Sequence, residues 1–447
     1  MSLTFAVADF LGGIRYQDLP ARTVEQAKLA LLDWLGVTLA GSQEASSVLF
    51  RETLAEFTGP AQADILGQGV KVDIFSAALA NGFASHVLDY DDIHLGMIGH
   101  PSVPVFPALI ALGQWKKVSG RDLIRAFVAG VELESRVGAA VNPEHYDRGW
   151  HSTATLGYLG AAAGAAALLQ LDTGAMVNAL GTAATQASGL RQVFGTMCKP
   201  FHPAKAASGG LMAAVLAEKG FTSSEDIIAG PNGFGSVMSD KFDPTSLTAG
   251  LGDSWAVDEI IIKRHASCYR THAVIECGLA LRESVLPQVD QIASVKCLIP
   301  PLAWDMAHIL DPQNGLEAKF SQPFCTAVAL VEGLATNQVF SLEKIKNPLI
   351  AGLIKKTTVE VDPALETTEA KVEIALKSGR SFCQQKDTEK LGLTPQQIKS
   401  ALEVKFKSLL KGHAPDGDIQ GLIKSVLELE STENIDLMIA GLPRMNR

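Results

Sequence analysis

Basic residues are in the minority in this chain of 447 residues, and its beginning lacks the basic leader of a secretory signal. Lysine and arginine together number 38 against 48 aspartates and glutamates, which gives a formal net charge of −10. A nucleic-acid partner or an anionic membrane would require a dominant basic face, so we expect neither. Asp9 interrupts the first apolar stretch, MSLTFAVADFLGGIRY, and this argues against a secreted protein.

Cysteine pairs are also lacking, because none of the six cysteines forms a CxxC motif and they follow no spacing typical of a disulfide framework. Reduced thiols in a cytoplasmic protein are therefore expected. Cys198, Cys268 and Cys277 are separated and show no iron–sulfur cluster spacing. The sequence contains no phosphate-binding loop, dinucleotide fingerprint or nucleophile elbow. We expect no bound cofactor.

One uncharged segment, Ser152 to Leu171, is long enough to be weighed as a membrane span. It consists largely of Ala, Gly and Thr, which contribute little transfer free energy. We interpret it as a buried helix whose small residues permit close packing, and we expect no membrane association.

The apolar residues from Thr23 to about Leu251 recur at helical spacing, as Ala27, Leu31 and Trp34 do near the start. The apolar fraction of 47% indicates a globular protein, and 447 residues exceed what one hydrophobic core usually supports. We therefore expect this helical half to form one large domain and the rest of the chain to contribute a second.

Short β-branched runs appear from about residue 257 onward: VDEIIIK, IASVKCLIP, TTVEVDP and KVEIALKSG. Helical stretches lie between them, which is the pattern of a smaller α+β domain. Helical spacing returns near the C-terminus. We predict a mainly α protein, with an all-helical domain over residues 1–263 that is completed by residues 396–447, and an α+β domain over residues 264–395.

Carboxylates and imidazoles are concentrated in VLDYDDIHLGMIGHPS, residues 87–102. A carboxylate beside an imidazole can divide base and acid roles between two groups of different pKa. The candidates are Asp89, Asp91, His94 and His100. Two alternatives remain open. The aspartates can occupy turn positions in a solvated loop, or the run can bind a divalent metal, although its spacing matches neither an EF-hand nor H-E-x-x-H. We expect chemistry without a metal.

Two further polar runs, GWHSTAT and CKPFHPAK, each precede a helical segment. His151 in the first lies at a predicted helix N-terminus, where the dipole favours anions. The alternative is a loop histidine with a satisfied hydrogen bond. Lys199 in the second lies in a loop stiffened by prolines, and it can hold a carboxylate or, when desolvated, act as a base. Lys205 is expected to be solvated.

The run IIKRHASCYRTH, residues 261–272, brings two histidines, one lysine and two arginines together in an acidic protein. Lys263 follows a strongly apolar run, so we expect it to emerge from a buried strand, and a buried lysine needs a carboxylate partner or a substrate anion. Arg270 and His272 are candidates for the same anion. The alternative is a basic surface edge, the commoner fate of such runs. Together the polar clusters indicate a catalytic site for an anionic substrate.

The motifs HVLDYDDIH, GHPS, GWHSTATLG, GTMCKPFHPAKAA and KRHASCYRTHA occur in the order and approximate spacing of the MmgE/PrpD family, which the chain resembles along nearly its whole length. The family includes 2-methylcitrate dehydratases, cis-aconitate decarboxylases and an iminodisuccinate epimerase. The resemblance implies a large all-helical domain, a smaller α+β lid domain inserted near the end, and a homodimer.

The resemblance also implies site residues. The active-site positions of decarboxylase members correspond here to Asp89, with Asp91 as the alternative aspartate, and to His100, His151, Lys199 and Lys263. As substrate-binding residues we predict Asp91, His94, Arg270 and His272. This chain departs from the family at Ile93, where a threonine often follows DYDD, and at residues 309–315, where ILDPQNG replaces an Asn-Arg-Pro stretch. Both departures bear on the substrate more than on the reaction class.

The family chemistries share the removal or delivery of a proton at a carbon next to a carboxylate. Such a carbon is a very weak acid, so the enolate-like charge that develops must meet fixed cations, for which Lys199 and Lys263 are the candidates. His100 and His151 would act as acid and base on the two sides of the substrate, with Asp89 orienting an imidazole.

The leading hypothesis is a cofactor-independent lyase of the 2-methylcitrate dehydratase type, acting on a small di- or tricarboxylate. The enzymatic alternatives are decarboxylation of a cis-aconitate-like acid and epimerisation of an iminodisuccinate-like acid. A further alternative of another class, motivated by Ile93 and the ILDPQNG segment, is a carboxylate-binding protein that has lost catalysis.

Overall fold

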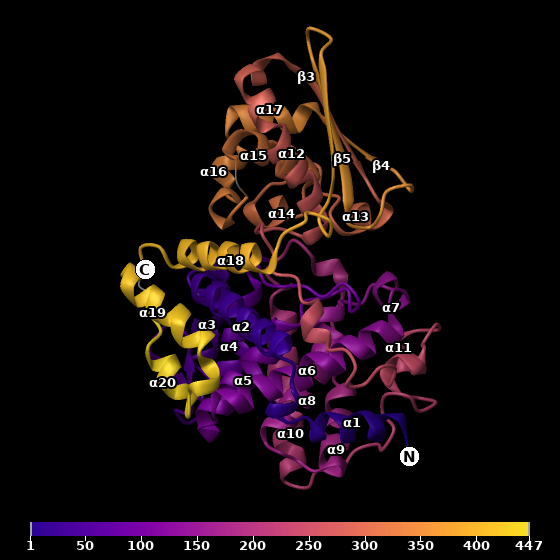
Figure 1. The fold of residues 1–447 in the computed structure, drawn as a ribbon, viewed down its shortest axis with the longest axis vertical. Coiled ribbons are helices and arrows are strands. Elements are labelled where there is room, and N and C mark those ends of the chain that lie inside the picture. Colours follow the sequence, from indigo (N-terminus) through magenta and orange to yellow (C-terminus); the bar gives the residue numbers. More distant parts are fainter. Residues whose placement is uncertain (1, 334, 446–447) are drawn as a thin grey trace. The chain divides into compact units, whose positions relative to one another are not determined.

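The computed structural model describes residues 2–333 and 335–445 and is drawn in Figure 1. By its internal contacts the chain divides into two compact units. Unit 1 comprises Met1–Val87, Asp91–Ile262 and Lys399–Arg447, and unit 2 comprises Leu88–Tyr90 and Lys263–Ile398. The domain boundaries 1–263, 264–395 and 396–447 that the sequence suggests remain a prediction.

Unit 1 is built mainly from helices, as the spacing of its apolar residues predicts. They are α1 (Leu3–Gly13), α2 (Ala21–Gly41), α3 (Ala45–Leu54), α4 (Ile74–His86), α5 (Ser102–Lys116), α6 (Gly120–Val141), α7 (Glu144–Asp147), α8 (Ser152–Leu168), α9 (Thr173–Ala184), α10 (Phe201–Glu218), α11 (Phe234–Met238), α19 (Asp416–Leu427), α20 (Ile435–Ala440) and the part of α18 (Pro395–Leu410) from Lys399 onward.

A small antiparallel ribbon corrects the expectation of an all-helical first domain. It pairs β1 (Ala63–Ile65) with β2 (Val70–Val72). Its turn contains Gly67 at φ 74° and Gly69 at φ 65°, the left-handed region that glycine enters without steric cost. Strands of three residues are too short to show an alternating pattern, so the periodicity of the sequence could not reveal them.

The core of unit 1 forms where α8 packs against α6 and α10. Every residue of α8 is buried, which confirms the interpretation of the uncharged segment as a buried helix. In the described part of the chain no helix is long and apolar enough to cross a membrane. Small residues let the backbones approach closely: a Cβ added at Gly210 of α10 would lie 2.7 Å from the carbonyl oxygen of Tyr158 in α8.

This close approach makes Gly210→Ala a test of the packing. The new methyl group would also lie 2.6 Å from Cβ of Ala161, so we expect a loss of about 1–3 kcal/mol in the free energy of unfolding. Gly421→Ala in α19 is the matched control, because nothing lies within 4 Å of its added Cβ, and it should stabilise by about 0.5–1 kcal/mol. Urea unfolding measures both, and equal effects of the two substitutions would contradict the packing described.

Unit 2 packs helices against one sheet (Figure 1). Its helices are α12 (His272–Val285), α13 (Pro301–Met306), α14 (Gly315–Ala318), α15 (Gln322–Glu332), α16 (Leu342–Ile345) and α17 (Pro348–Lys356). The strands are β3 (Ile292–Ile299), β4 (Thr357–Val361), β5 (Glu369–Leu376) and β6 (Ser381–Asp387), in the order β4-β3-β5-β6. The β3–β4 pair is parallel and the other two pairs are antiparallel. Every second residue of β5 is buried, as expected for a sheet covered on one face.

Three of the four strand predictions are confirmed, and the fourth is wrong. VDEIIIK forms a single 3-10 turn, Ala256–Glu259, and Ile261 makes only an isolated bridge with Ile93. Val257 and Ile260 are buried in the unit 1 core and Ile262 packs partly buried against it, so burial rather than a ladder explains the run. Lys263 therefore does not emerge from a strand. The polar strand β6 was missed because its sequence, SFCQQKD, lacks an apolar alternation.

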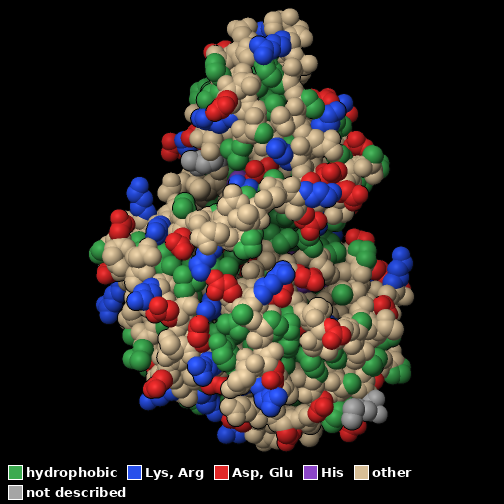
Figure 2. All heavy atoms as spheres, in the orientation of Figure 1, with side chains coloured by type: hydrophobic (Ala, Val, Ile, Leu, Met, Phe, Trp, Pro, Cys, Tyr) green, Lys and Arg blue, Asp and Glu red, His purple; other side chains and the backbone are tan. Residues whose placement is uncertain are grey.

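The surface drawn in Figure 2 carries both signs of charge. Lysine and arginine side chains are interspersed with aspartate and glutamate side chains over this face, and small apolar patches lie between them.

Candidate active site

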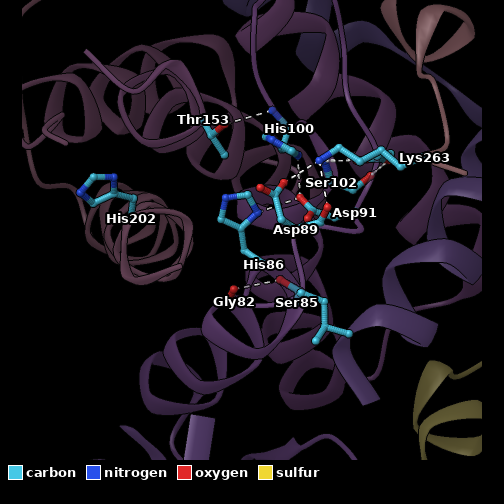
Figure 3. A network of polar contacts seen from close by, with 12 residues as sticks. Gly82, Ser85, His86, Asp89, Asp91, His100, Ser102, Thr153, His202 and Lys263 are labelled. Carbon is cyan, nitrogen blue, oxygen red and sulfur yellow. Dashed lines mark hydrogen bonds and ion pairs between the residues drawn. The ribbon is translucent and has the colours of Figure 1, made fainter. Parts of the chain in front are cut away.

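A carboxylate flanked by two imidazoles lies in unit 1. His86 is the last residue of α4, Asp91 lies in the loop that follows, and His100 precedes α5. Oδ2 of Asp91 lies 2.9 Å from Nδ1 of His86 and 2.8 Å from Nδ1 of His100 (Figure 3). The backbone N–H of His100 donates to Oγ1 of Thr153 at 3.1 Å, which ties this loop to the first turn of α8. The three side chains form one hydrogen-bonding unit.

Burial and mutual attraction set the charges of this unit. The pKa of His86 is lowered to about 4. Burial is the main cause and the nearby positive charge of Lys199 adds to it, while the negative charge of Asp91 acts in the opposite direction. Burial alone would raise the pKa of Asp91, but His100 and His86 together hold it well below its usual range. Asp91 is therefore a carboxylate near neutral pH, and it can fix the orientation of both rings.

A second pair of imidazoles lies beside the first. His151 is the N-cap of α8, and its Nδ1 lies 2.9 Å from Nδ1 of His202 in α10, so one ring donates and the other accepts. Burial is the main cause that lowers the pKa of His151 well below its usual range, and the charges of His202 and Lys199 add to it. Lys199 itself lies in the turn before α10, with Nζ 5.4 Å from the ring centroid of Phe194. Neutral imidazoles next to a lysine suit proton transfer close to an anion.

Unit 2 contains the other predicted catalytic pair. Nζ of Lys263 donates to Oδ1 of Asp89 at 2.5 Å and to its carbonyl oxygen at 3.0 Å. Lys319 donates to the carbonyl oxygens of Leu88 and Ala266, and the Tyr90 hydroxyl donates to the carbonyl of Arg264 at 3.0 Å. These contacts explain why residues 88–90 belong to unit 2. Asp89 has φ 50°, a left-handed conformation that aspartate tolerates better than most residues.

The remaining predicted substrate-binding residues occupy separate places. Arg270 in unit 2 donates to the carbonyl oxygen of Thr367 at 2.7 Å. His272 begins α12, and burial and His265 lower its pKa well below its usual range. His94 lies in unit 1 with Nε2 3.4 Å from Glu259, and burial lowers its pKa to about 4.

The structure thus distributes the predicted site residues over its two units. Asp91, His100, His151 and Lys199 come together in unit 1, and Asp89, Lys263, Arg270 and His272 belong to unit 2. Sequence reasoning missed His86 and His202. The available signals were weak: His86 stands five positions before Asp91 in an apolar helix, and His202 stands three positions after Lys199.

Three buried acids, Asp33, Asp92 and Glu134, lie near the first cluster in unit 1. Ser102 donates to Asp92 at 2.5 Å, and burial raises the pKa of Asp92 well above its usual range, with Asp33 adding to it. Burial does the same for Glu134, whose pKa the neighbouring Asp92 raises further. Asp33 forms an ion pair of 2.6 Å with Lys405 of α18. Burial therefore favours the protonated forms of Asp92 and Glu134, and Lys405 provides a buried cation for this acidic region.

Acidification is expected to destabilise the fold. Seven histidines have lowered pKa values, chiefly through burial: His86, His94, His145, His151, His202, His265 and His272. In the unfolded chain histidine titrates near pH 6.5, so below this pH the unfolded chain binds more protons and each such group costs up to about 1.4 kcal/mol per pH unit.

Three acids oppose this trend, since the raised pKa values of Asp92, Glu132 and Glu134 let the folded chain bind more protons above about pH 4. Seven groups outnumber three, so the free energy of unfolding should fall between about pH 6.5 and about pH 4. Urea unfolding at several pH values measures this slope, and a flat or rising profile would contradict the assigned charge states.

The comparisons with known proteins agree with the motifs. The MmgE/PrpD N-terminal domain matches residues 6–247 and the MmgE/PrpD C-terminal domain matches residues 265–429. The chain belongs to the MmgE/PrpD family, as the sequence predicts.

Three of its relatives are described as cis-aconitate decarboxylases. The cis-aconitate decarboxylase of Homo sapiens is 26% identical over 454 residues, which cover 98% of this chain and 94% of the human protein. The cis-aconitate decarboxylase of Mus musculus is 26% identical over 457 residues, with 98% and 92% covered. The cis-aconitate decarboxylase of Aspergillus terreus is 28% identical over 288 residues, with 61% and 59% covered.

Proposed function

We propose that this protein is a decarboxylase that acts on cis-aconitate or a closely similar unsaturated tricarboxylate. The observation that carries the proposal is the likeness to the human cis-aconitate decarboxylase over 98% of the chain. Among the enzymatic hypotheses from the sequence, the relatives favour the decarboxylase alternative over the 2-methylcitrate dehydratase, which they do not specifically support. A small polycarboxylate substrate, a homodimer and a cytoplasmic location remain part of the proposal.

The reaction requires one carbon–carbon bond to break and one carbon–hydrogen bond to form. In cis-aconitate, the bond between the methylene carbon and its carboxylate breaks, and CO₂ leaves. The electron pair forms a new double bond to the central carbon, while the former double bond shifts its electrons to the far carbon, which takes a proton. The product is a dicarboxylate with a terminal methylene group. Negative charge develops during this shift, so fixed positive charge and a proton donor at the far carbon are needed.

The cluster in unit 1 offers suitable groups for both needs. An ionised carboxylate 2.8 Å from an imidazole stabilises the imidazolium form, so His100 beside Asp91 is our proton donor. We assign Lys199 to bind a substrate carboxylate, because its ammonium group is a compact positive charge and its side chain is buried. His151, held neutral by burial, is suited to hydrogen-bond the substrate or to relay a proton.

Product analysis by NMR in D₂O tests the proposal directly. The purified protein is incubated separately with cis-aconitate, 2-methylcitrate, citrate and iminodisuccinate. We expect CO₂ from cis-aconitate and one deuterium at the carbon that accepts the proton. Loss or gain of water without CO₂ would favour the dehydratase, and exchange of α-hydrogen alone would favour the epimerase. Tricarboxylate binding measured by calorimetry, with no turnover of any acid, would favour a binding protein.

Two lysines near the start of α10 provide a matched pair for the substrate-anchoring role. Lys199 is buried, whereas Lys205 is exposed on α10. Lys199→Met should raise KM at least about tenfold, since a buried cation that meets a carboxylate is worth roughly 1.5–3 kcal/mol. Lys205→Met should leave KM unchanged. Steady-state kinetics on cis-aconitate measure both, and similar KM values for the two variants would refute the role of Lys199.

A further inference from the structure

The unit formed by His86, Asp91 and His100 has the composition and spacing of a metal-ligand set. One ligand atom from each of these residues lies within 4.8 Å of the others. Two imidazole nitrogens and one carboxylate oxygen are donors that Zn²⁺ and similar divalent transition-metal ions accept. Donors about 2.0–2.2 Å from one metal lie about 3 Å apart. The separations of 2.9 Å and 2.8 Å between Asp91 and the two rings are close to this value.

Unsatisfied polar atoms in the same place point independently to a ligand. Oδ1 of Asp91 and Nε2 of His86 are buried and have no hydrogen-bond partner among the described residues. Asp91 is 1% exposed and His86 is 1% exposed, so bulk water does not compensate. Buried polar atoms without a partner are rare in proteins and call for a ligand, an ion or a water molecule. An ion beside Asp91 can bind through Oδ1 as well as Oδ2, because the described residues leave Oδ1 without a hydrogen-bond partner.

We propose that His86, Asp91 and His100 bind a divalent transition-metal ion such as Zn²⁺, and that the bound ion inhibits the enzyme. The inhibition rests on the proposed function, whereas the binding does not. A metal at this position uses the nitrogen lone pairs and the Asp91 oxygen that otherwise hold and orient the proton of His100. The ion is therefore an inhibitor that competes with proton transfer and is not a cofactor.

The positive charge of Lys199 should affect the affinities for metal and substrate in opposite directions. Lys199 is the nearby cation whose charge acts on His86 and His151. It opposes a metal cation and, under the proposed function, attracts the substrate anion. Lys199→Met should therefore tighten Zn²⁺ binding roughly tenfold, while it weakens binding of the polycarboxylate. An effect of the same sign on both ligands would overturn the assignment.

The binding test uses the full chain without an affinity tag, stripped with EDTA and titrated with ZnCl₂ by calorimetry. Cys198 and Cys383 are exposed, and thiolates in general are zinc ligands, so the experiment uses the double variant Cys198→Ser/Cys383→Ser. We expect one Zn²⁺ per chain. In a crystal soaked with ZnCl₂, the anomalous peak should lie about 2.0–2.2 Å from the three ligand atoms.

Variants assign the site. His86→Gln and Asp91→Asn should each lower Zn²⁺ affinity about tenfold or more, and circular dichroism confirms that each variant is folded. His308→Gln removes an exposed histidine of unit 2 and should leave the affinity unchanged. An anomalous peak elsewhere, no binding, or binding that survives both substitutions would overturn the proposed site.

The two proposals can fail separately. If zinc occupies the site but none of the four acids is turned over, the metal site stands and the decarboxylase proposal fails. If cis-aconitate is turned over at the same rate with and without the bound ion, the decarboxylase stands and the proposed inhibition fails.

Discussion

Replacing His100 by glutamine is expected to lower kcat by roughly 10²–10⁴-fold, the usual contribution of a positioned acid or base. Glutamine keeps a polar side chain of similar reach but cannot carry the proton. His308→Gln is the matched control, since His308 is an exposed histidine whose ring contacts the carbonyl of Trp304, and its kcat should equal that of the unmodified protein. Turnover of cis-aconitate measures both variants.

The partnership between His100 and Asp91 predicts how their substitutions combine. Asp91 orients the ring of His100 across 2.8 Å, so its role ends when His100 is lost. The single substitution Asp91→Asn should lower kcat. The kcat of the double variant Asp91→Asn/His100→Gln should be only slightly below that of His100→Gln. Multiplicative effects in the double variant would mean that the two residues act independently, and the proposed unit would then be wrong.

Replacing Lys405 by methionine is expected to cost about 3–5 kcal/mol of the free energy of unfolding, the usual result of removing one partner from a buried ion pair. Lys405 and Asp33 are paired at 2.6 Å, and their side chains are 5% and 1% exposed. Without the lysine, Asp33 would be a buried carboxylate close to Asp92, and Lys405 interacts favourably with both acids. Urea unfolding measures the loss.

Two further variants separate the ion pair from general packing. Lys407→Met changes an exposed lysine of the same helix, α18, and should alter stability by no more than about 0.5 kcal/mol. Lys405→Met/Asp33→Leu removes both charges and should recover most of the loss, because a buried pair replaced by apolar side chains is often neutral. If the double variant is less stable than Lys405→Met alone, the pair is not the cause of the effect.

The helical half shows how far periodicity alone can go. The spacing of Ala27, Leu31 and Trp34 predicts α2, and the uncharged composition of 152–171 predicts the buried helix α8. These features are local, because a helix places residues three and four positions apart on one face whatever surrounds it. The run VDEIIIK fails for the same reason: its apolar residues indicate burial, but burial in a turn and burial in a strand look alike over seven residues.

The candidate site divides in a similar way. The sequence singles out Asp91, His100, His151 and Lys199 because polar runs beside apolar helices are conspicuous and match the family motifs. It does not reveal that Asp91 holds two imidazoles while Asp89, two positions earlier, pairs with Lys263. Alternate positions of an irregular loop can face in any direction, so no spacing rule assigns their partners.

By itself, then, the sequence determined the mainly helical architecture, the strands β3, β4 and β5, and the family, since these depend on local periodicity and on motifs read in order. Only the tertiary structure decided the partners of the buried charges: His86 with Asp91, His151 with His202, and Asp33 with Lys405. Asp33 and Lys405 stand 372 positions apart in the chain, and a buried charge is tolerated only where folding brings a compensating group to it.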